Sequence, residues 1–189
     1  MKIFILSSSP NKDGLTASCA SAANEGIHDA GGDVEEIYLN DRDLDKCHTC
    51  NNGWGTCLDE HRCQELDEFQ DLHAQLAQAD GVVLVTPVYW GEMSESAKAF
   101  TDRLRRCEAT REPGQSILHG KPVIAVAAAG GSGGGMITCL ASMERWIQHV
   151  QARVFDLIPV NRWSREYKLV TIRAAGKAMA EELLQKERK

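Results

Sequence analysis

The sequence has no apolar run that approaches the roughly 20 residues needed to cross a membrane. It also lacks a basic stripe interleaved with aromatic residues, and its 21 basic against 27 acidic side chains give a formal net charge of -6. The apolar start of the chain, Ile3–Leu6, is too short for the core of a signal peptide. We therefore expect no nucleic-acid partner, no membrane association and a cytoplasmic location.

Internal repeats, low-complexity tracts and linkers are absent as well. The 189 residues, 43% of them hydrophobic, suffice for one α/β domain. Seven cysteines form an odd and high number for a chain with no export signal, so we expect thiolates for metal or redox chemistry rather than disulfides. We predict a single domain over residues 1–189, with a cysteine-rich insertion at 40–64.

Short apolar runs alternate with longer amphipathic segments along the chain. The runs predict five strands, at Lys2–Leu6, Val34–Leu39, Val82–Thr86, Val123–Ala127 and Val154–Ile158. The longer segments predict helices, at Thr16–Ala30, Leu66–Ala79, Ser94–Cys107, Met136–Val150 and Lys168–Lys186. Strand and helix alternation of this kind requires right-handed parallel crossovers, so the fold class is α/β with helices on both faces of a five-stranded parallel sheet.

In such a sheet, ligands bind at the carboxyl ends of the strands. The loop after the first strand, Ser7–Thr16, places hydroxyls before a helix N-terminus, whose free amides and dipole attract a phosphate. It is neither a GxGxxG fingerprint nor a Walker A loop, which removes the main support for a dinucleotide-binding or NTPase function. The alternative is a serine-rich turn that only caps the helix.

The loop after the third strand, Thr86–Ser94, contains Tyr89 and Trp90 beside Pro87 and Gly91. Adjacent aromatics offer a flat apolar surface that suits one edge of a planar heteroaromatic ring. The alternative is that they cover the end of the sheet.

The loop after the fourth strand has five glycines in the six positions 130–135. Glycine removes side chains and lets a ring approach the main chain closely, whereas the alternative is a flexible linker.

Together the three loops resemble the NADPH-dependent FMN reductase family of flavodoxin-like proteins, especially its iron-sulfur flavoprotein branch. Ser8–Thr16 is similar to the family's phosphate loop, with Ser8, Asn11 and Leu15 as departures and without the usual arginine. Thr86–Gly91, followed by Met93–Ser94 and Lys98–Phe100, is similar to its flavin loop, and the glycine run to the loop on the other side of the ring.

The resemblance implies a flavodoxin-like three-layer sandwich that binds FMN non-covalently, takes electrons from NAD(P)H and forms a homodimer or homotetramer. No catalytic side chain is implied, because the flavin itself performs the redox chemistry. The implied FMN-binding residues are Ser7, Ser9, Asn11, Gly14, Leu15, Thr16, Pro87, Val88, Tyr89, Trp90, Gly91, Ser94, Gly130, Gly131, Ser132, Gly133 and Gly134.

Four of the cysteines lie within the insertion with the spacing Cys47-x2-Cys50-x6-Cys57-x5-Cys63. Four thiolates can hold zinc or an iron-sulfur cluster. Iron-sulfur flavoproteins are similar, with a Cys-x2-Cys-x2-Cys-x5-Cys pattern; here Gly53 stands at the third position, and residues 52–56 move that cysteine to Cys57. A 4Fe-4S cluster, zinc and free thiols all stay open.

Other polar and cysteine residues receive structural assignments. We expect His48 and His61 to be solvated loop histidines. We expect Glu92, Asp102 and Arg103 to be helix-cap and surface-pair residues. Cys19, Cys107 and Cys139 fall in helical segments and are predicted to be small buried hydrophobes.

Two functions follow from these patterns. One is an NAD(P)H-dependent FMN oxidoreductase that reduces a quinone, a flavin or a redox protein. The other is an iron-sulfur flavoprotein that carries electrons with FMN and a 4Fe-4S cluster. A metal-stabilised interaction module with an empty flavin site is a third alternative.

Overall fold

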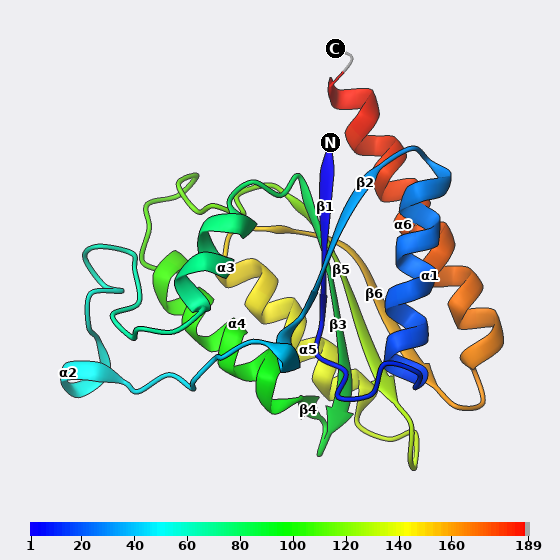
Figure 1. Cartoon of the computed structure of the whole chain (residues 1–189), viewed down its shortest axis with the longest axis horizontal. Helices are drawn as coiled ribbons and strands as arrows, with labels where there is room; N and C mark the ends of the chain where they lie inside the picture. Colours follow the sequence, from blue (N-terminus) through cyan, green and yellow to red (C-terminus); the bar gives the residue numbers. More distant parts are fainter. Residues whose placement is uncertain (188–189) are drawn as a thin grey trace.

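The chain forms a parallel sheet in the order β2-β1-β3-β5-β6 in a computed structural model that describes residues 1–187 (Figure 1). Its strands are β1 (Lys2–Ser7), β2 (Asp33–Tyr38), β3 (Gly81–Tyr89), β5 (Pro122–Ala129) and β6 (Arg153–Asn161). All five were predicted from apolar runs, which are typical of strands buried on both faces. A two-residue strand, β4 (Glu92–Met93), pairs antiparallel with the end of β3 and was not predicted.

Helices cover both faces of the sheet. Helices α1 (Leu15–Asp29) and α6 (Arg165–Glu187) lie together on one face. Helices α3 (Phe69–Leu76), α4 (Glu95–Glu108) and α5 (Met136–His149) lie on the other (Figure 1). The predicted three-layer α/β sandwich is therefore confirmed.

Alternation along each strand divides the interior into two cores. In β1, Ile3 and Ile5 belong to the core under α1 and α6, whereas Phe4 and Leu6 belong to the core under α3, α4 and α5. Each helical layer thus packs on its own set of strand side chains.

Two helices begin three residues away from their predicted starts, for local reasons. Helix α3 begins at Phe69 rather than Leu66, because Leu66 is exposed and the Asp67 carboxylate accepts a hydrogen bond from the Phe69 N–H at 3.0 Å. Helix α6 begins at Arg165 rather than Lys168, because Asn161 Oδ1 accepts the N–H groups of Trp163 and Ser164 and forms the preceding turn.

Helix α1 approaches α6 very closely at Gly26, where an added Cβ would lie 2.0 Å from the carbonyl oxygen of Arg173. Alanine normally stabilises a helix interior by about 1 kcal/mol relative to glycine. Overpacking against backbone costs about 1 to 3 kcal/mol or more, so the clash outweighs the gain in helix propensity and the net change in stability is unfavourable. We expect Gly26→Ala to lower the free energy of unfolding measured in urea.

The control for this substitution is Ser21→Ala, on the exposed side of the same helix, which adds helix propensity without a clash. It should leave stability unchanged or slightly raised. A Gly26→Ala protein as stable as the parent would show that α1 and α6 separate freely.

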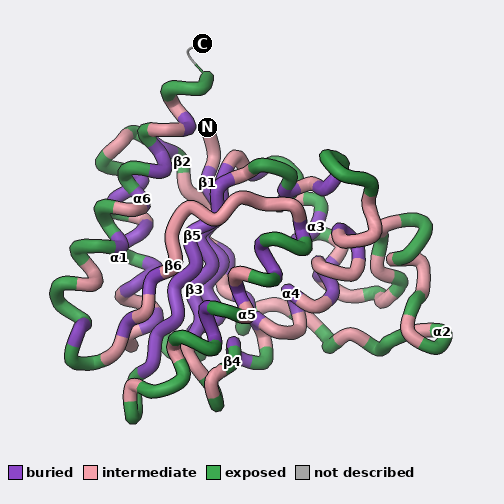
Figure 2. The backbone as a smooth tube through the Cα atoms, turned by 180° about the vertical axis from the view of Figure 1, so that it is seen from behind, coloured by how far each residue is buried: buried purple, intermediate pink, exposed green. Residues whose placement is uncertain are grey.

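The predicted insertion at 40–64, here called the cysteine segment, runs outside the sandwich beside α3 and α4 (Figure 1). A short 3₁₀ helix, η1 (Leu39–Asp41), leads into it, and it contains the short element α2 (Cys50–Gly53), in which Asn51 and Asn52 have left-handed backbone angles. Figure 2 shows that it is mostly exposed or half-buried, whereas β1, β3 and β5 are buried.

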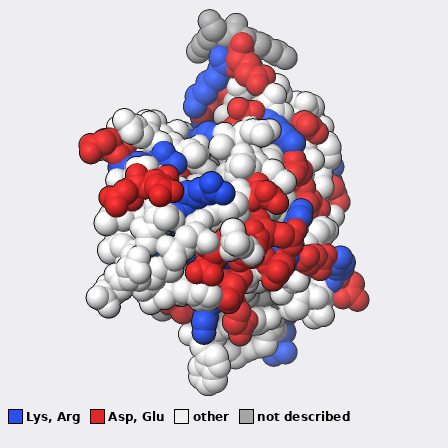
Figure 3. Space-filling model, turned by 60° about the vertical axis from the view of Figure 1, so that its left-hand side comes forward, with Lys and Arg blue, Asp and Glu red and all other residues white. Residues whose placement is uncertain are grey.

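The charge on the surface agrees with the composition. Acidic side chains gather in a broad band on the face shown in Figure 3, as the formal net charge of -6 leads one to expect. Among the helices within residues 1–187, none combines the length and apolar character that a membrane crossing requires.

Candidate functional site

The loops after β1, β3 and β5 meet at one edge of the sheet, because parallel strands end at the same edge. The first loop is tied to β3 by the N–H of Ser8, which donates to the carbonyl of Val85 at 3.0 Å. The loop after β3 is tied to α5 by Thr138, whose hydroxyl donates to the carbonyl of Gly91 at 3.0 Å.

A pocket of about 260 Å³ lies between these three loops. It is lined by Ser9, Pro10, Asn11, Gly14, Leu15, Thr16, Pro87, Val88, Tyr89, Ala128, Gly130 and Gly131. A second hollow continues from it past Trp90 and along residues 129–135. We call the two together the cradle.

The phosphate end of the cradle is the N-terminus of α1. Within the described chain, no side chain caps α1 at Gly14, and no acidic residue lies in its first turn. Its first backbone N–H groups and the positive end of the helix dipole therefore face the pocket without competition from a carboxylate. This arrangement fits the terminal phosphate of FMN.

The ring end of the cradle has open backbone on one side and aromatics on the other. A Cβ added at Gly130 or Gly131 would meet no atom within 4 Å, so the glycine loop leaves room for a flat group. Tyr89 is 39% exposed and Trp90 is fully exposed with φ of 53°. Trp90 therefore does not cover the end of the sheet, which was the alternative to a flavin contact.

Most of the residues predicted to bind FMN line the cradle, and two do not. Ser7 is fully buried within β1. Ser94 is buried at the end of the loop after β3, where its N–H donates a hydrogen bond to Thr86 Oγ1 at 3.1 Å. Sequence reasoning did not include five further lining residues. The first two of them, at the end of β5, are Ala128 and Ala129, and the others are Pro10, Gly135 and Thr138. The small side chains at the end of β5 were the available signal for the first two.

The four cysteines of the segment line a different pocket, of about 20 Å³, which shares no lining residue with the cradle. Arg103 and Arg106 of α4 line it as well. Within residues 1–187, no three His, Cys, Asp or Glu side chains lie close enough together for a single metal ion. Four thiolates that line one pocket are the donor set that an iron-sulfur cluster takes.

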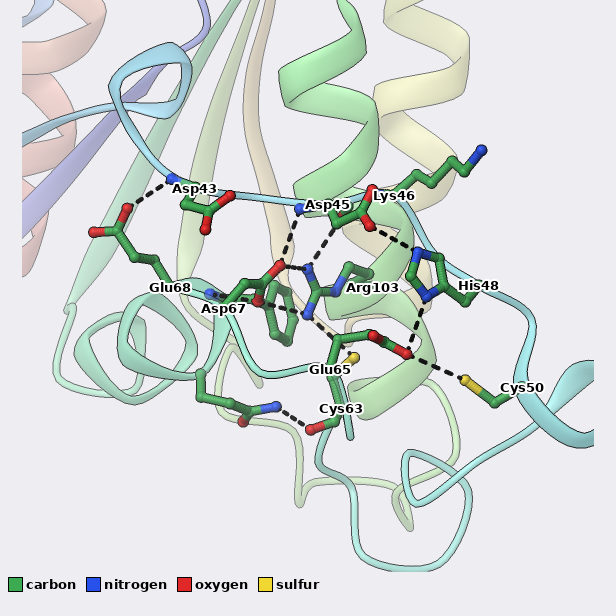
Figure 4. Close-up of polar contacts among 12 residues, drawn as sticks. Asp43, Asp45, Lys46, His48, Cys50, Cys63, Glu65, Asp67, Glu68 and Arg103 are labelled. Carbon is green, nitrogen blue, oxygen red and sulfur yellow. Dashed lines mark hydrogen bonds and ion pairs between the residues drawn. The ribbon is translucent and has the colours of Figure 1, made fainter.

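Polar contacts surround this cysteine pocket (Figure 4). His48 lies between two carboxylates, with Nε2 2.8 Å from Asp45 and Nδ1 3.1 Å from Glu65. The Cys50 thiol points to the same Glu65 carboxylate, with Sγ and Oε1 3.8 Å apart. Burial raises the pKa of Cys50, and the charge of Glu65 raises it further.

His48 is an exposed loop residue, as predicted, and His61 is a half-buried one, and each ring also has polar partners. Besides the carboxylate contacts of His48, the Nδ1 atom of His61 lies 3.1 Å from the hydroxyl oxygen of Thr110. Both rings therefore connect the segment to other side chains.

The prediction that Arg103 is a surface-pair residue is wrong. Its side chain is only 1% exposed and forms an ion pair with Asp67. Burial alone would raise the pKa of Asp67, but hydrogen bonds from Arg103 and from backbone N–H groups outweigh it and hold that pKa below its ordinary value. The neighbouring Asp102 is a surface-pair residue as predicted, 2.5 Å from Lys98 Nζ.

The three helical cysteines are buried, as predicted. Cys19, Cys107 and Cys139 are 0% exposed, and burial raises the pKa of each thiol to about 12. They are protonated, inert core residues and supply no ligand to the cysteine pocket.

A five-stranded parallel sheet in this order, with its pocket at the switch between β1 and β3, defines a flavodoxin-like protein. A solved archaeal flavodoxin superposes with a TM-score of 0.64 over 97% of this chain and 99% of its own, at 18% identity. The NAD(P)H:quinone oxidoreductase of Methanothermobacter marburgensis superposes with a TM-score of 0.70 over 95% of this chain and 96% of its own, at 19% identity. These likenesses confirm the predicted fold.

The NADPH-dependent FMN reductase family matches residues 1–158, so the chain belongs to that family. An iron-sulfur flavoprotein of Methanocaldococcus jannaschii is 33% identical over 105 residues, 56% of this chain and 52% of that protein. The chain thus spans about half the length of this curated relative.

Proposed function

We propose that the protein is an FMN-dependent oxidoreductase that accepts electrons from NADH or NADPH and passes them to a quinone, a flavin or a redox protein. The observation that carries the proposal is the cradle, in which an uncapped helix N-terminus and an open glycine loop face one pocket. Membership of the NADPH-dependent FMN reductase family supports the same donor and cofactor.

The chain's own residues would bind and orient rather than catalyse. FMN, when bound, supplies hydride and single-electron chemistry. The amides at the start of α1 would hold its phosphate, and Gly130 and Gly131 would admit the ring beside the main chain. Tyr89 and Trp90 would shape the open side, where a nicotinamide can approach from solvent.

The direct test is to identify the flavin and its donor. The cradle has one phosphate-binding helix terminus and the sequence has no second nucleotide fingerprint, so purified protein should release FMN rather than FAD by mass. Anaerobic addition of NADPH or NADH should then bleach the flavin absorbance. Bound FAD, or a flavin that neither nucleotide reduces, would contradict the proposal.

Replacing Trp90 with alanine should weaken FMN binding without loss of folding stability. Loss of one flat aromatic contact costs about 0.5 to 1.5 kcal/mol, which is an increase in Kd of about 2- to 10-fold. Because Trp90 is fully exposed, the urea midpoint should stay unchanged. Fluorescence titration of apoprotein with FMN measures the first effect.

The matched control is Trp54→Ala, since Trp54 packs over Arg106 in the cysteine segment, outside the cradle. It should bind FMN like the parent. If Trp90→Ala also binds FMN and oxidises NAD(P)H like the parent, Trp90 has no part in the site.

A second function, electron transfer by FMN together with a 4Fe-4S cluster, is favoured by the four cysteines that line one pocket. Cys47, Cys50, Cys57 and Cys63 would hold the cluster, whose chemistry is one-electron transfer. An absorbance spectrum of protein prepared without oxygen separates the alternatives. Flavin bands with a broad shoulder indicate both cofactors, and flavin bands alone indicate a simple reductase.

We also propose a cytoplasmic homodimer or homotetramer. The seven cysteines are all free thiols, which suits a reducing compartment. The same assembly is what the resemblance to the FMN reductase family implies. Light scattering after size exclusion tests the assembly, and a monomer would contradict it.

A further inference from the structure

Arg103 is a fully buried cation at the base of the cysteine segment, with no role in the flavin cradle. It projects from α4, and its side chain is 1% exposed. Its guanidinium lies over the ring of Phe69, 4.4 Å from the centroid. Burying a charge is costly unless it is paired, and although Nε of Arg103 has no partner among the described residues, both terminal nitrogens do, so those partners indicate what the residue does.

The guanidinium divides its hydrogen bonds among three parts of the chain (Figure 4). Nη2 donates to Asp67 Oδ1 at 2.8 Å and to Cys63 Sγ at 3.3 Å. Nη1 donates to the carbonyl of Asp45 at 3.0 Å and to the second Asp67 oxygen. One planar group therefore contacts Asp45 near the start of the segment, its cysteine Cys63, and Asp67, three residues after its end.

Residues near the start of the segment are also paired with the residues that follow its end. The N–H of Asp45 donates to Asp67 at 2.9 Å, and the N–H of Asp43 donates to Glu68 at 2.6 Å. Arg103 forms an ion pair with the same Asp67 carboxylate that accepts the Asp45 N–H. Without Arg103, the closure of the loop that carries the cysteines would depend on a carboxylate with no buried counter-charge.

We propose that Arg103 is a positioning residue for the cysteine site: it closes the segment at its base and donates a hydrogen bond to the sulfur of the ligand Cys63. The role rests on the proposed iron-sulfur cluster. Partners that orient metal ligands alter metal affinity by about 10- to 100-fold. Hydrogen bonds to ligand sulfurs and nearby positive charge stabilise the reduced, more negative form of a cluster, so Arg103 raises its reduction potential.

The first test variant is Arg103→Lys, which keeps the positive charge but has a single ammonium that cannot serve Asp67, Asp45 and Cys63 together. A second variant carries Arg103→Gln with Asp67→Asn, so that neither charge is left buried and unpaired. Arg105→Lys, on the same helix and outside the cysteine pocket, is the control. All are purified with FMN and reconstituted anaerobically with iron and sulfide.

Three measurements follow. The rate at which EDTA removes iron should be about 10-fold higher in both test variants than in the parent and in Arg105→Lys. The midpoint potential of the iron chromophore should shift to more negative values, while that of FMN in the same titration stays fixed. Before reconstitution, trypsin should cut more rapidly after Arg42, Lys46 and Arg62 in the test variants.

A purely structural arginine would change melting temperature but not the midpoint of the iron chromophore, and this result would overturn the proposal. Test variants that keep FMN but take up no iron support it, because the flavin site reports an intact fold. If the parent itself takes up no iron, the cluster proposal fails. The tryptic rates then decide the closing role separately, and equal rates in parent and variants would reject it.

Discussion

Replacing Cys57 with serine is expected to remove most of the iron and acid-labile sulfide from anaerobically reconstituted protein while FMN stays bound. Cys57 lines the cysteine pocket together with Cys47, Cys50 and Cys63, and a serine hydroxyl stays protonated where a metal-bound thiol does not. FMN should be retained because the cradle and the cysteine pocket share no residue. Iron, sulfide and flavin are measured per chain on the same sample.

Cys139→Ser is the control for general loss of a thiol, since Cys139 is buried in α5 outside the cysteine pocket. It should keep the parent's iron content even if it melts earlier. Parent protein without iron after reconstitution, or Cys57→Ser with its full complement, would leave a flavin reductase with free thiols.

The sheet and the three loops could be predicted because their signals are local. Strands buried on both faces have continuous apolar sequences, such as Val82–Val85. The predicted strands accordingly match the observed ones. The carboxyl ends of parallel strands meet at one edge whatever the detailed packing, so the loop residues could be assigned to one pocket before their geometry was known. Ser7 and Ser94 do not line the cradle because both are buried where a strand or helix meets its loop, and the sequence pattern does not mark that depth.

Arg103 could not be predicted because its environment is made by distant residues. Its partner Asp67 lies 36 positions earlier, and a charged residue in an amphipathic helix is usually solvated. The strand β4 was missed for a related reason, since two residues carry no period and are defined only by their pairing with Val88 and Tyr89. In both cases a contact between segments overrode the local pattern.

The glycine run in the cradle also contains a contact that its local sequence did not reveal. Its sequence indicated open backbone, and Gly130 and Gly131 indeed have no neighbour at the Cβ position. Gly135 at the end of the run is different, because it contacts the loop after β3 directly. An added Cβ there would lie 2.7 Å from the Cα of Gly91 and 3.0 Å from its nitrogen.

Gly135→Ala is therefore expected to raise the Kd for FMN by about 10- to 100-fold. Gly135 has φ of 79°, a conformation that costs a residue with a side chain about 1 to 3 kcal/mol, and each 1.4 kcal/mol is tenfold in affinity. The added methyl can be accommodated only if the loop after β5 moves away from Gly91, which separates the two sides of the ring site. Titration of apoprotein with FMN measures the change.

Gly130→Ala distinguishes this effect from a general intolerance of side chains in the loop. Gly130 lines both parts of the cradle, but a Cβ there meets nothing within 4 Å. If the cradle is filled by the flavin ring, Gly130→Ala should also weaken FMN binding while leaving the stability of the apoprotein unchanged. Gly135→Ala should weaken binding and destabilise the apoprotein as well, because its clash is with the chain itself. Equal stability of the two apoproteins would show that the contact between Gly135 and Gly91 does not hold the cradle together.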